Sequence, residues 1–325
     1  MLKKIRVEEA VGKRLLHDIT AIKPDGFKGR EFKRGHLIQE ADIPRLKDIG
    51  KDHVFVGELE PGQVHEEDAA KALAEWVTGP NIEAGPPSEG KIALKSQVDG
   101  LFVLDRESLD AINSVGDYTL ATRWNLSPVQ AGDTLVGLRI VPLLTEQDQV
   151  DRAVAIAQAG QPVFQVVSYQ TLKIGVIITG SEVYHGRIQD RFEPVLRDKF
   201  SDFPTEILGF TKCPDDLDHI SQALEAYLSQ DADLVILTGG MSVDPDDLTP
   251  TAIRQSGAQV ISQGVPVQPG NMLMLAQLGS SYLLGLPGAS IHAPVTSFDT
   301  LLPRFYAKYP ITKADLIALG EGGLY

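Results

Sequence analysis

Residues 172–303 alternate apolar runs with amphipathic segments, and this pattern constrains the fold more than any other feature of the chain. Apolar runs stand at 172–180, 205–211 and 232–240, and segments with helical periodicity separate them. Such an alternation predicts a parallel sheet covered on both faces, with right-handed crossovers. Residues 271–288 then predict a hairpin that ends at Pro287-Gly288, and a last helix through Ser297 and Leu302 follows.

The rest of the chain has a different pattern, and 325 residues exceed the size at which one hydrophobic core usually stops growing. Residues 1–84 predict a small α/β unit and linker, because short helix and strand signals precede a stretch rich in Gly and Pro. Residues 85–170 predict a β-rich middle domain, in which Asp99-Gly100 between apolar runs is typical of a hairpin turn. Residues 171–310 hold the α/β domain, and residues 311–325 form a C-terminal tail.

The charge and cysteine content exclude several classes of partner. A formal net charge of −14 argues against a nucleic-acid or anionic-membrane surface, because both require clustered Lys and Arg. The start of the chain lacks the apolar stretch of a signal peptide, and no segment approaches the roughly 20 apolar residues of a spanning helix. We therefore expect neither a nucleic-acid nor a membrane partner. A single cysteine, Cys213, excludes an intrachain disulfide and favours a cytoplasmic location.

Two familiar kinds of site are disfavoured by spacing. The seven histidines include no pair at the i, i+4 spacing with which a helix binds zinc. Residues 85–92 nearly match the phosphate loop G-x-x-x-x-G-K-[ST]. However, Ile92 stands where a magnesium-binding hydroxyl is required, and Pro86 and Pro87 donate no backbone N–H.

Three strands of the predicted sheet end in turns that combine glycine with small hydroxyl side chains. The turns are Thr179-Gly180-Ser181, Thr238-Gly239-Gly240-Met241-Ser242 and Pro287-Gly288-Ala289-Ser290. Ligands of open α/β sheets bind beyond the carboxyl ends of the strands. Glycine lets the backbone approach a ligand closely, and a following helix N-terminus favours negative charge. The three turns together predict a site for a phosphorylated ligand.

Carboxylates accompany the same turns. Glu182 and Asp190 follow the first strand, Asp215-Asp216 the second and Asp246-Asp247 the third. Acids beside a phosphate repel it unless a divalent cation lies between them, so the sequence predicts Mg²⁺ held by Glu182, Asp246 and Asp247. Asp215 and Asp216 have a competing interpretation as N-caps of the helix that follows them.

Five ordered segments carry a resemblance to a known family. They are Thr179-Gly180-Ser181-Glu182, Gly186-Arg187-Ile188-Gln189-Asp190, Thr238-Gly239-Gly240-Met241-Ser242-Val243, Pro269-Gly270 and Leu286-Pro287-Gly288. The corresponding family motifs are T-G-D-E, G-x-I-x-D, T-G-G-V-S-V, P-G-K-P and L-P-G-N-P. Residues 176–303 therefore resemble the molybdopterin-binding domain of molybdenum-cofactor biosynthesis, and particularly the molybdopterin molybdenumtransferases. Residues 27–50 also resemble a segment of these transferases.

The resemblance implies a Rossmann-like three-layer α/β domain that holds molybdopterin, or its adenylylated form, in these loops. It implies functional carboxylates at Glu182, Asp247 and one acid of the Asp215-Asp216 pair, which we take to be Asp216. In the transferases the nucleotide bond of the ligand is split with Mg²⁺ as molybdate is inserted. Relatives of this domain assemble as dimers or trimers, so a homo-oligomer is expected. The implied ligand-binding residues are Thr179, Gly180, Ser181, Thr238, Gly239, Gly240, Met241, Ser242, Pro269, Gly270, Pro287, Gly288, Ala289 and Ser290.

The chain also departs from the family pattern. Asn271-Met272 replaces Lys-Pro, Ala289-Ser290 replaces Asn-Pro, and Asp244 replaces a glycine. Loss of a cation near the oxyanion site favours binding of the pterin over chemistry on molybdate, because neutral Asn cannot offset the charge.

Three functions remain open from the sequence. The first is a transferase that inserts molybdate, and the second is a non-catalytic carrier or sensor that serves a molybdoenzyme partner. The third is a metal-dependent nucleotide pyrophosphatase, because Asp246-Asp247-Leu248-Thr249 resembles the D-D-L-T of the competence/damage-inducible proteins.

Overall fold

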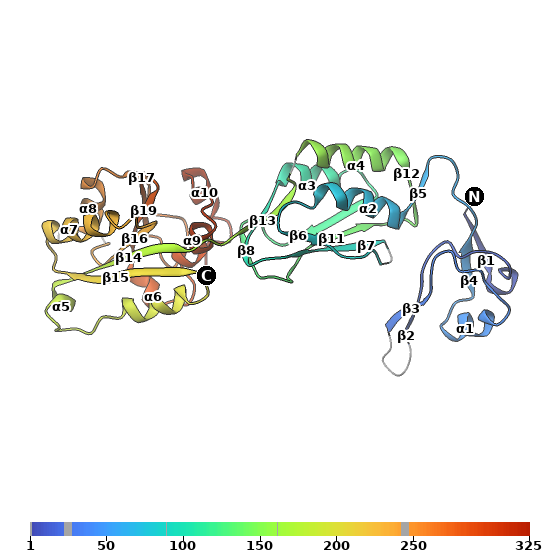
Figure 1. Ribbon diagram of the computed structural model, residues 1–325, viewed down its shortest axis with the longest axis horizontal. Helices are drawn as coiled ribbons and strands as arrows, with labels where there is room; N and C mark the ends of the chain where they lie inside the picture. Colours follow the sequence, from blue (N-terminus) through green and yellow to red (C-terminus); the bar gives the residue numbers. More distant parts are fainter. Residues whose placement is uncertain (1, 23–27, 89, 161, 242–246) are drawn as a thin grey trace. The chain divides into compact units, whose positions relative to one another are not determined.

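The computed structural model describes residues 2–22, 28–88, 90–160, 162–241 and 247–325. The chain divides into two compact units, with the boundary between Val166 and Val167 (Figure 1). Unit 1 precedes this boundary and unit 2 follows it, and each has hydrophobic clusters of its own. Within the described ranges, no helix is long and apolar enough to cross a membrane.

The first part of unit 1 is a small mixed structure around one hydrophobic cluster. Strand β1 (Lys3–Arg6) pairs antiparallel with β4 (His53–Val56), and β2 (Ile19–Ile22) pairs with β3 (Lys28–Phe32). The 3-10 turn η1 (Val7–Glu9) and helix α1 (Asp42–Asp48) contribute buried Val7 and Leu46 to this cluster, where they join Val54.

The second part of unit 1 packs three helices against its strands. The helices are α2 (Glu66–Val77), α3 (Arg106–Asn113) and α4 (Gln147–Ala159). One antiparallel sheet has the order β6 (Ile82–Ala84), β7 (Lys91–Ser96), β11 (Thr134–Ile140), β9 (Tyr118–Thr122). A second has the order β10 (Ser127–Val129), β8 (Gly100–Leu104), β13 (Phe164–Ser168). A two-stranded ladder joins β5 (Gln63–His65) to β12 (Leu144–Glu146).

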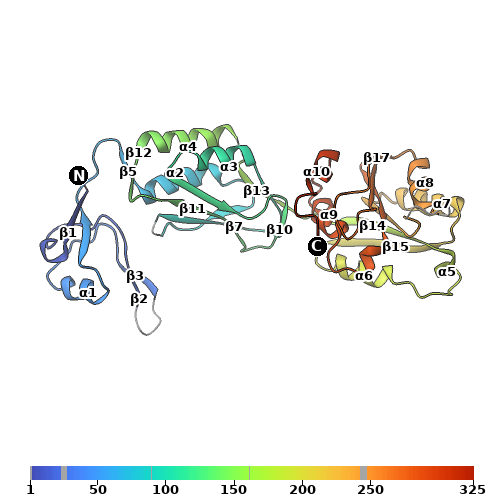
Figure 2. The ribbon, with the colours of Figure 1, turned by 180° about the vertical axis from the view of Figure 1, so that it is seen from behind.

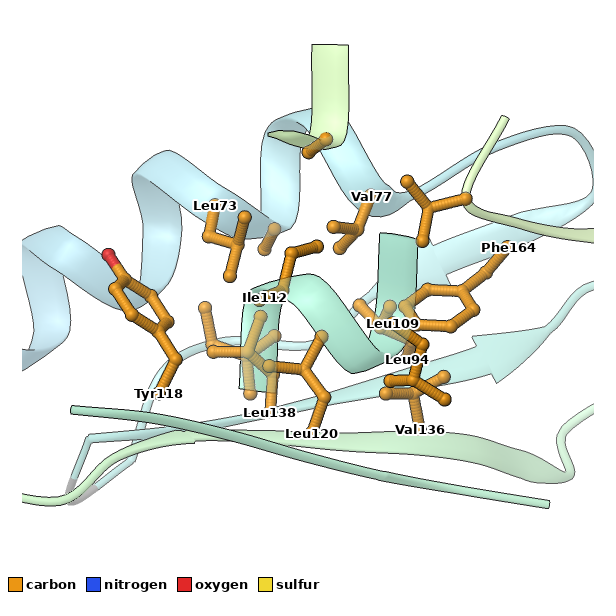
Figure 3. Packing of buried hydrophobic residues seen from close by; sticks show 14 of the residues in the cluster. Leu73, Val77, Leu94, Leu109, Ile112, Tyr118, Leu120, Val136, Leu138 and Phe164 are labelled. Atoms are coloured by element: carbon orange, nitrogen blue, oxygen red, sulfur yellow. The ribbon is translucent and has the colours of Figure 1, made fainter. Parts of the chain in front are cut away.

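Alternation of side chains along the strands explains how this core forms. Strand β11 buries Val136 and Leu138 while Gly137 and Arg139 between and after them are exposed, which is the period of two expected for a half-buried strand. Figure 3 shows the buried side chains directed toward Leu73 and Val77 of α2. One face of the sheet is therefore covered by helices.

The prediction of a hairpin at Asp99-Gly100 is wrong. Strand β7 ends before this turn and pairs with β6 and β11, whereas β8 begins at Gly100 and pairs with β10 and β13. The two strands need different surroundings, since β7 has an exposed face and all five residues of β8 are buried. The Asp99 carboxylate instead accepts a hydrogen bond from the Ala131 N–H at 2.8 Å.

His65 caps the N-terminus of α2. The Glu67 backbone N–H donates to His65 Nδ1 at 3.2 Å, and His65 Nε2 lies 2.8 Å from the Leu16 carbonyl oxygen. This arrangement requires a neutral imidazole with its proton on Nε2, because a protonated Nδ1 cannot accept a hydrogen bond. Burial, followed by the charge of Arg34, lowers the pKa of His65 below its usual 6.5.

We therefore expect the free energy of unfolding of unit 1 to fall as the pH drops below about 6.5. At a pH between the lowered pKa of His65 in the folded chain and its pKa in the unfolded chain, the unfolded chain binds a proton that the folded chain does not. The stability contributed by neutral His65 is therefore complete above the unfolded pKa and is lost as the pH falls through the folded pKa. Urea titrations at about pH 7.5 and about pH 5.5 check this. Tryptophan fluorescence reports on unit 1 alone, because both tryptophans, Trp76 and Trp124, lie there. His65→Asn keeps a capping oxygen without titrating, so an equal loss in both proteins would contradict the assignment.

Unit 2 is built on one six-stranded sheet. Its order is β15 (Thr205–Cys213), β14 (Leu172–Thr179), β16 (Leu234–Thr238), β19 (Ser281–Leu286), β18 (Met274–Leu278), β17 (Gln259–Gln263). The first four strands are parallel, and the hairpin β18–β19 adds an antiparallel edge. The predicted parallel sheet and hairpin are confirmed.

Helices cover both faces of this sheet. Ile174, Val176 and Ile178 of β14 pack with α6 (Phe192–Phe200) and α9 (Ser297–Tyr306). Ile177 packs on the other face with α7 (Leu217–Leu228) and α8 (Thr249–Gln255). Both views show α6 on the opposite side of the sheet from α7 and α8 (Figure 1, Figure 2). Unit 2 is therefore a three-layer α/β structure, and burial on both faces explains why β14 reads as a continuous apolar run.

Three short elements complete unit 2. They are α5 (Ser181–Tyr184), which follows β14, η2 (Gly288–Ile291), which follows β19, and α10 (Lys313–Ala318), which buries Leu316 near the end of the chain.

Candidate functional site

The predicted turns lie together at the carboxyl edge of the sheet in unit 2. Three neighbouring strands are in register near their carboxyl ends, with Ile178 beside Thr238 and Thr238 beside Leu286. Strand β15 lies on one side of β14 while β16 lies on the other, so the strand order reverses between β14 and β16. Ligands of open α/β sheets bind outside the strand ends at such a reversal.

Close backbone contact joins the first two turns. Gly239 has φ +85°, and a Cβ at this position would lie 2.5 Å from the Thr179 carbonyl oxygen and 2.6 Å from Thr179 Oγ1. The Thr179 hydroxyl donates to the Thr238 carbonyl at 2.9 Å, and the Thr249 hydroxyl donates to the Gly239 carbonyl at 2.8 Å. Only glycine fits at position 239, and the ends of β14 and β16 are held together as one surface.

Two hydroxyls at this edge are buried without a hydrogen-bond partner among the described residues. Thr238 is fully buried and Ser290 is 1% exposed, and neither Thr238 Oγ1 nor Ser290 Oγ is bonded. An unpartnered buried hydroxyl costs roughly 1–3 kcal/mol. Native proteins retain such groups at few positions, and a bound ligand is one reason to retain them.

Asp215 connects the first turn to the loop after β15. Its carboxylate accepts a hydrogen bond from the Ser181 N–H at 2.7 Å, and the Asp215 N–H donates to Ser181 Oγ at 3.3 Å. Ser181, where the family motif has an acid, therefore takes part in a reciprocal pair that fixes the start of α5. Adjacent acids at 215 and 216 look alike in sequence, so this role could not be assigned to Asp215 rather than to Asp216 before the contacts were known.

Asp216 is the N-cap of α7, and Asp190 caps α6 from the position before its N-cap residue, Arg191. The Asp216 carboxylate accepts from the His219 backbone N–H at 3.0 Å, and His219 Nδ1 lies 2.6 Å from the same oxygen. The hydrogen bond from the His219 side chain, followed by that from its backbone, lowers the pKa of Asp216. Asp190 accepts from the backbone N–H groups of Phe192 and Glu193 at the start of α6. The capping interpretation of Asp216 is therefore correct, and its predicted catalytic role has no further support in the described contacts.

Glu182 and Met241 differ in what they offer to a ligand. Glu182 is exposed, and its carboxylate oxygen lies 3.2 Å from the position that a Cβ on Gly180 would take. Met241 is 6% exposed and packs in the hydrophobic cluster with Leu237 and Ile253. Only the backbone of Met241 is available to a ligand.

The start of α9 holds the loop of Pro269 and Gly270. The Ser297 N–H donates to the Pro269 carbonyl at 3.2 Å, and the Ser297 hydroxyl donates to the Gly270 carbonyl at 2.6 Å. Pro287 precedes η2, which contains Gly288, Ala289 and Ser290. Met274 pairs with Gly285, one residue before the end of β19, so the loop of Pro269 and Gly270 lies at the same edge as the three turns. Ser297 was not among the predicted site residues.

The predicted metal ligands are only partly described. Ser242 and Asp246 lie outside the described residues. Asp247 is half-buried, and its Cα lies 3.5 Å from the position that a Cβ on Gly240 would take. Within the described ranges, no group of three or more His, Cys, Asp or Glu side chains could hold a metal ion. Glu182 and Asp247 are the two predicted ligands that the structure describes.

Family models match two segments of the chain. Residues 175–307 match a probable molybdopterin binding domain. Unit 2 belongs to the molybdopterin-binding domain family. The five motifs predicted this family, and the match confirms it. Residues 4–58, in the first part of unit 1, match a domain of unknown function, and this match includes residues 27–50, which resemble the transferases.

Curated relatives of the molybdopterin-binding domain include two enzymes. The chain is 30% identical over 146 residues to the molybdopterin molybdenumtransferase of Haemophilus influenzae, a stretch of 43% of this chain and 36% of that protein. It is 25% identical over 176 residues to the same enzyme of Synechococcus elongatus, covering 51% of this chain and 44% of the relative. The matched stretch therefore spans less than half the length of either relative.

Two further proteins resemble the chain. A CinA-like protein of Mycobacterium marinum is 34% identical over 90 residues, which cover 27% of this chain and 21% of that protein. The solved molybdopterin biosynthesis MoeA protein from Pyrococcus horikosii is 15% identical, with a TM-score of 0.36, and covers 95% of this chain and 75% of that one.

Proposed function

We propose that this chain binds molybdopterin, or its adenylylated form, at the carboxyl edge of the sheet in unit 2. The observation that carries the proposal is a pair of buried hydroxyls, Thr238 Oγ1 and Ser290 Oγ, which have no hydrogen-bond partner among the described residues and lie at the edge where the strand order reverses. The family match of residues 175–307 supports the pterin as the ligand. The two hydroxyls would donate hydrogen bonds to it, and the backbones of Gly180, Gly239, Gly240 and Met241 would approach it closely.

The proposal is tested by isothermal titration of the full chain with molybdopterin and with its adenylylated form. Saturable binding of either with one site per chain is the expected result, and the absence of binding of both would overturn the proposal. Mass spectrometry of what copurifies with the protein from a cofactor-producing host identifies which form it carries.

Mg²⁺ is compatible with this site. Mg²⁺ is usually bound through one or two carboxylates together with the phosphates of a substrate, and it retains several waters. Glu182 and Asp247 therefore suffice in number to hold it, and when bound it would offset the charge of the phosphate. The chain's own residues would hold the ion and place the phosphate, while the exposed Glu182 remains accessible to water.

Replacing Asp247 with Asn is expected to abolish the gain in ligand affinity that Mg²⁺ provides. Each carboxylate contact with the ion strengthens the phosphate site, so we expect about tenfold tighter binding of the adenylylated ligand with Mg²⁺ in the original protein and little change in the variant. Asp218→Asn, an exposed residue in the first turn of α7, is the matched control for loss of one charge. Titration with and without Mg²⁺ measures the effect. An equal gain in all three proteins would exclude Asp247 as a ligand.

Addition of molybdate separates a transferase from a carrier. If the chain is a transferase, adenylylated molybdopterin releases AMP when molybdate and Mg²⁺ are added. A carrier or sensor retains the ligand unchanged and requires a molybdoenzyme partner. Asn271 in place of the family's Lys favours the carrier, because the cation that would offset an oxyanion is missing.

A second candidate function is cleavage of nucleotide pyrophosphates. The similarity to a CinA-like protein over 90 residues, together with Asp247-Leu248-Thr249, favours it. Hydrolysis of ADP-ribose by the purified chain would support this function, and binding of molybdopterin without such hydrolysis would exclude it. Either function is compatible with a cytoplasmic location and with assembly into dimers or trimers, both of which remain predictions.

A further inference from the structure

The last residues of the chain run beside one of the predicted ligand loops. The Gln268 N–H donates to the Gly323 carbonyl at 2.7 Å, and the Tyr325 N–H donates to the Gln268 carbonyl at 2.9 Å. Gln268 and Leu324 thereby form a parallel β-bridge. We call residues 323–325 the strap. Both polar groups of the Gln268 backbone are bonded to it, so the strap fixes the residue that directly precedes Pro269.

The other side of the same loop is held by α9. The Pro269 and Gly270 carbonyls both accept from Ser297, and a Cβ on Gly270 would lie 2.5 Å from Ser297 Oγ. This loop therefore lies between the strap and the start of α9, at the edge where the three glycine turns gather. Removal of the strap would free one of its two supports.

The strap contributes little to the hydrophobic core. Leu324 is 81% exposed and Tyr325 is 59% exposed, so their side chains bury little apolar surface. The Tyr325 hydroxyl lies 3.2 Å from Thr300 Oγ1, which is a contact near the surface. Gly323 by contrast leaves no room for a side chain, because a Cβ there would collide with the carbonyl oxygens of Pro266 and Leu319. The strap is thus a backbone contact of defined geometry rather than a part of the core.

We propose that the strap residues Gly323, Leu324 and Tyr325 are positioning residues, which hold Gln268 so that Pro269 and Gly270 face the ligand. The inference rests on the proposed function, in which Pro269 and Gly270 contact molybdopterin. The strap acts only through the loop and does not touch the ligand. Loss of the strap should therefore lower the affinity for the ligand while the hydrophobic core stays folded.

Three variants of the full chain test this inference with molybdopterin as the probe. Deletion of residues 323–325 removes both hydrogen bonds to Gln268. Of the two hydrogen bonds to Gln268, Tyr325→Pro removes the one donated by the Tyr325 N–H, and it also removes the hydroxyl beside Thr300 Oγ1. The extended conformation of a β-bridge at Leu324 is compatible with a following proline. Leu324→Ala keeps every backbone bond and is the matched control.

We expect the deletion to weaken molybdopterin binding about 25-fold and Tyr325→Pro to weaken it roughly fivefold, since each backbone hydrogen bond contributes about a factor of five. Leu324→Ala should bind like the original chain and keep its melting temperature. The melting temperature should fall by no more than about 4 °C in Tyr325→Pro and about 8 °C in the deletion variant, since one hydrogen bond of about 1 kcal/mol corresponds to about 2–4 °C in a unit of this size. Hydrogen exchange at the Gln268 amide should accelerate in the deletion variant, with no change in β14 or β16.

Three outcomes would overturn the inference. They are equal affinity of the deletion variant and the original chain, a loss of affinity accompanied by a fall in melting temperature well beyond about 8 °C, and unchanged exchange at Gln268. Failure of the original chain itself to bind would overturn the proposed function instead, and exchange at Gln268 would still decide whether the strap holds the loop.

Discussion

Replacing Gly239 with alanine is expected to lower the free energy of unfolding of unit 2 by about 3 kcal/mol and to abolish ligand binding. The left-handed backbone at φ +85° costs an L-residue roughly 1–2 kcal/mol. The added methyl would also lie 2.5 Å from the Thr179 carbonyl oxygen, and relief of such overpacking costs roughly 1–3 kcal/mol. Backbone at the ends of β14 and β16 must separate to admit it, and this separation would change the surface that faces the ligand.

Gly257→Ala is the control that isolates the close contact. Gly257 has φ +83°, nearly the same as Gly239, but a Cβ there meets no atom within 4 Å. We expect a loss of about 1 kcal/mol in the free energy of unfolding and normal ligand binding. Hydrogen exchange measured by mass spectrometry resolves unit 2 from unit 1 in both variants. Equal losses at the two positions would show that conformation alone, and not the approach to Thr179, determines the need for glycine at 239.

The sheet of unit 2 was predictable because its strands are buried on both faces. In β14, residues on one face join one cluster and Ile177 joins the other, so no polar residue interrupts positions 174–178. Strand ends of a parallel sheet meet at one edge, and the glycine turns could therefore be placed together before their contacts were known. The positions of the glycine turns along the chain were therefore sufficient to predict that the turns lie at one edge of the sheet.

Contacts between segments distant in sequence could not be predicted. Asp215 and Asp216 are adjacent acids before a helix, yet one bonds Ser181, 34 residues away, and the other caps α7. Met241 sits within a glycine-rich turn but packs into the core. Asp99-Gly100 is a typical turn sequence, but β7 and β8 differ in burial and each pairs with other strands. The cap at Asp216 is local and was one of the two interpretations of that residue; for Asp215, Met241 and Asp99-Gly100 the partner that decides the role lies far along the chain.

Thr238→Val is expected to change stability and affinity in opposite directions. Valine has nearly the shape of threonine and suits a strand, so the substitution removes only the hydroxyl. Because that hydroxyl is buried and has no partner among the described residues, we expect unit 2 without ligand to gain about 1 kcal/mol in free energy of unfolding. The affinity for molybdopterin should fall about tenfold, or about a hundredfold if the hydroxyl donates to a charged group of the ligand.

Thr179→Val provides the matched comparison on the neighbouring strand. The Thr179 hydroxyl donates to the Thr238 carbonyl at 2.9 Å, so its removal leaves a buried acceptor without this donor and should cost about 1 kcal/mol of stability. Calorimetric unfolding and titration of both variants give the two signs directly. If Thr238→Val lost stability as Thr179→Val does, its hydroxyl would have a partner within the protein. If Thr238→Val gained stability but kept its affinity, the ligand would not bind this hydroxyl. A hydroxyl that serves the ligand should lower the stability of the free protein and raise the affinity, so its removal should change both.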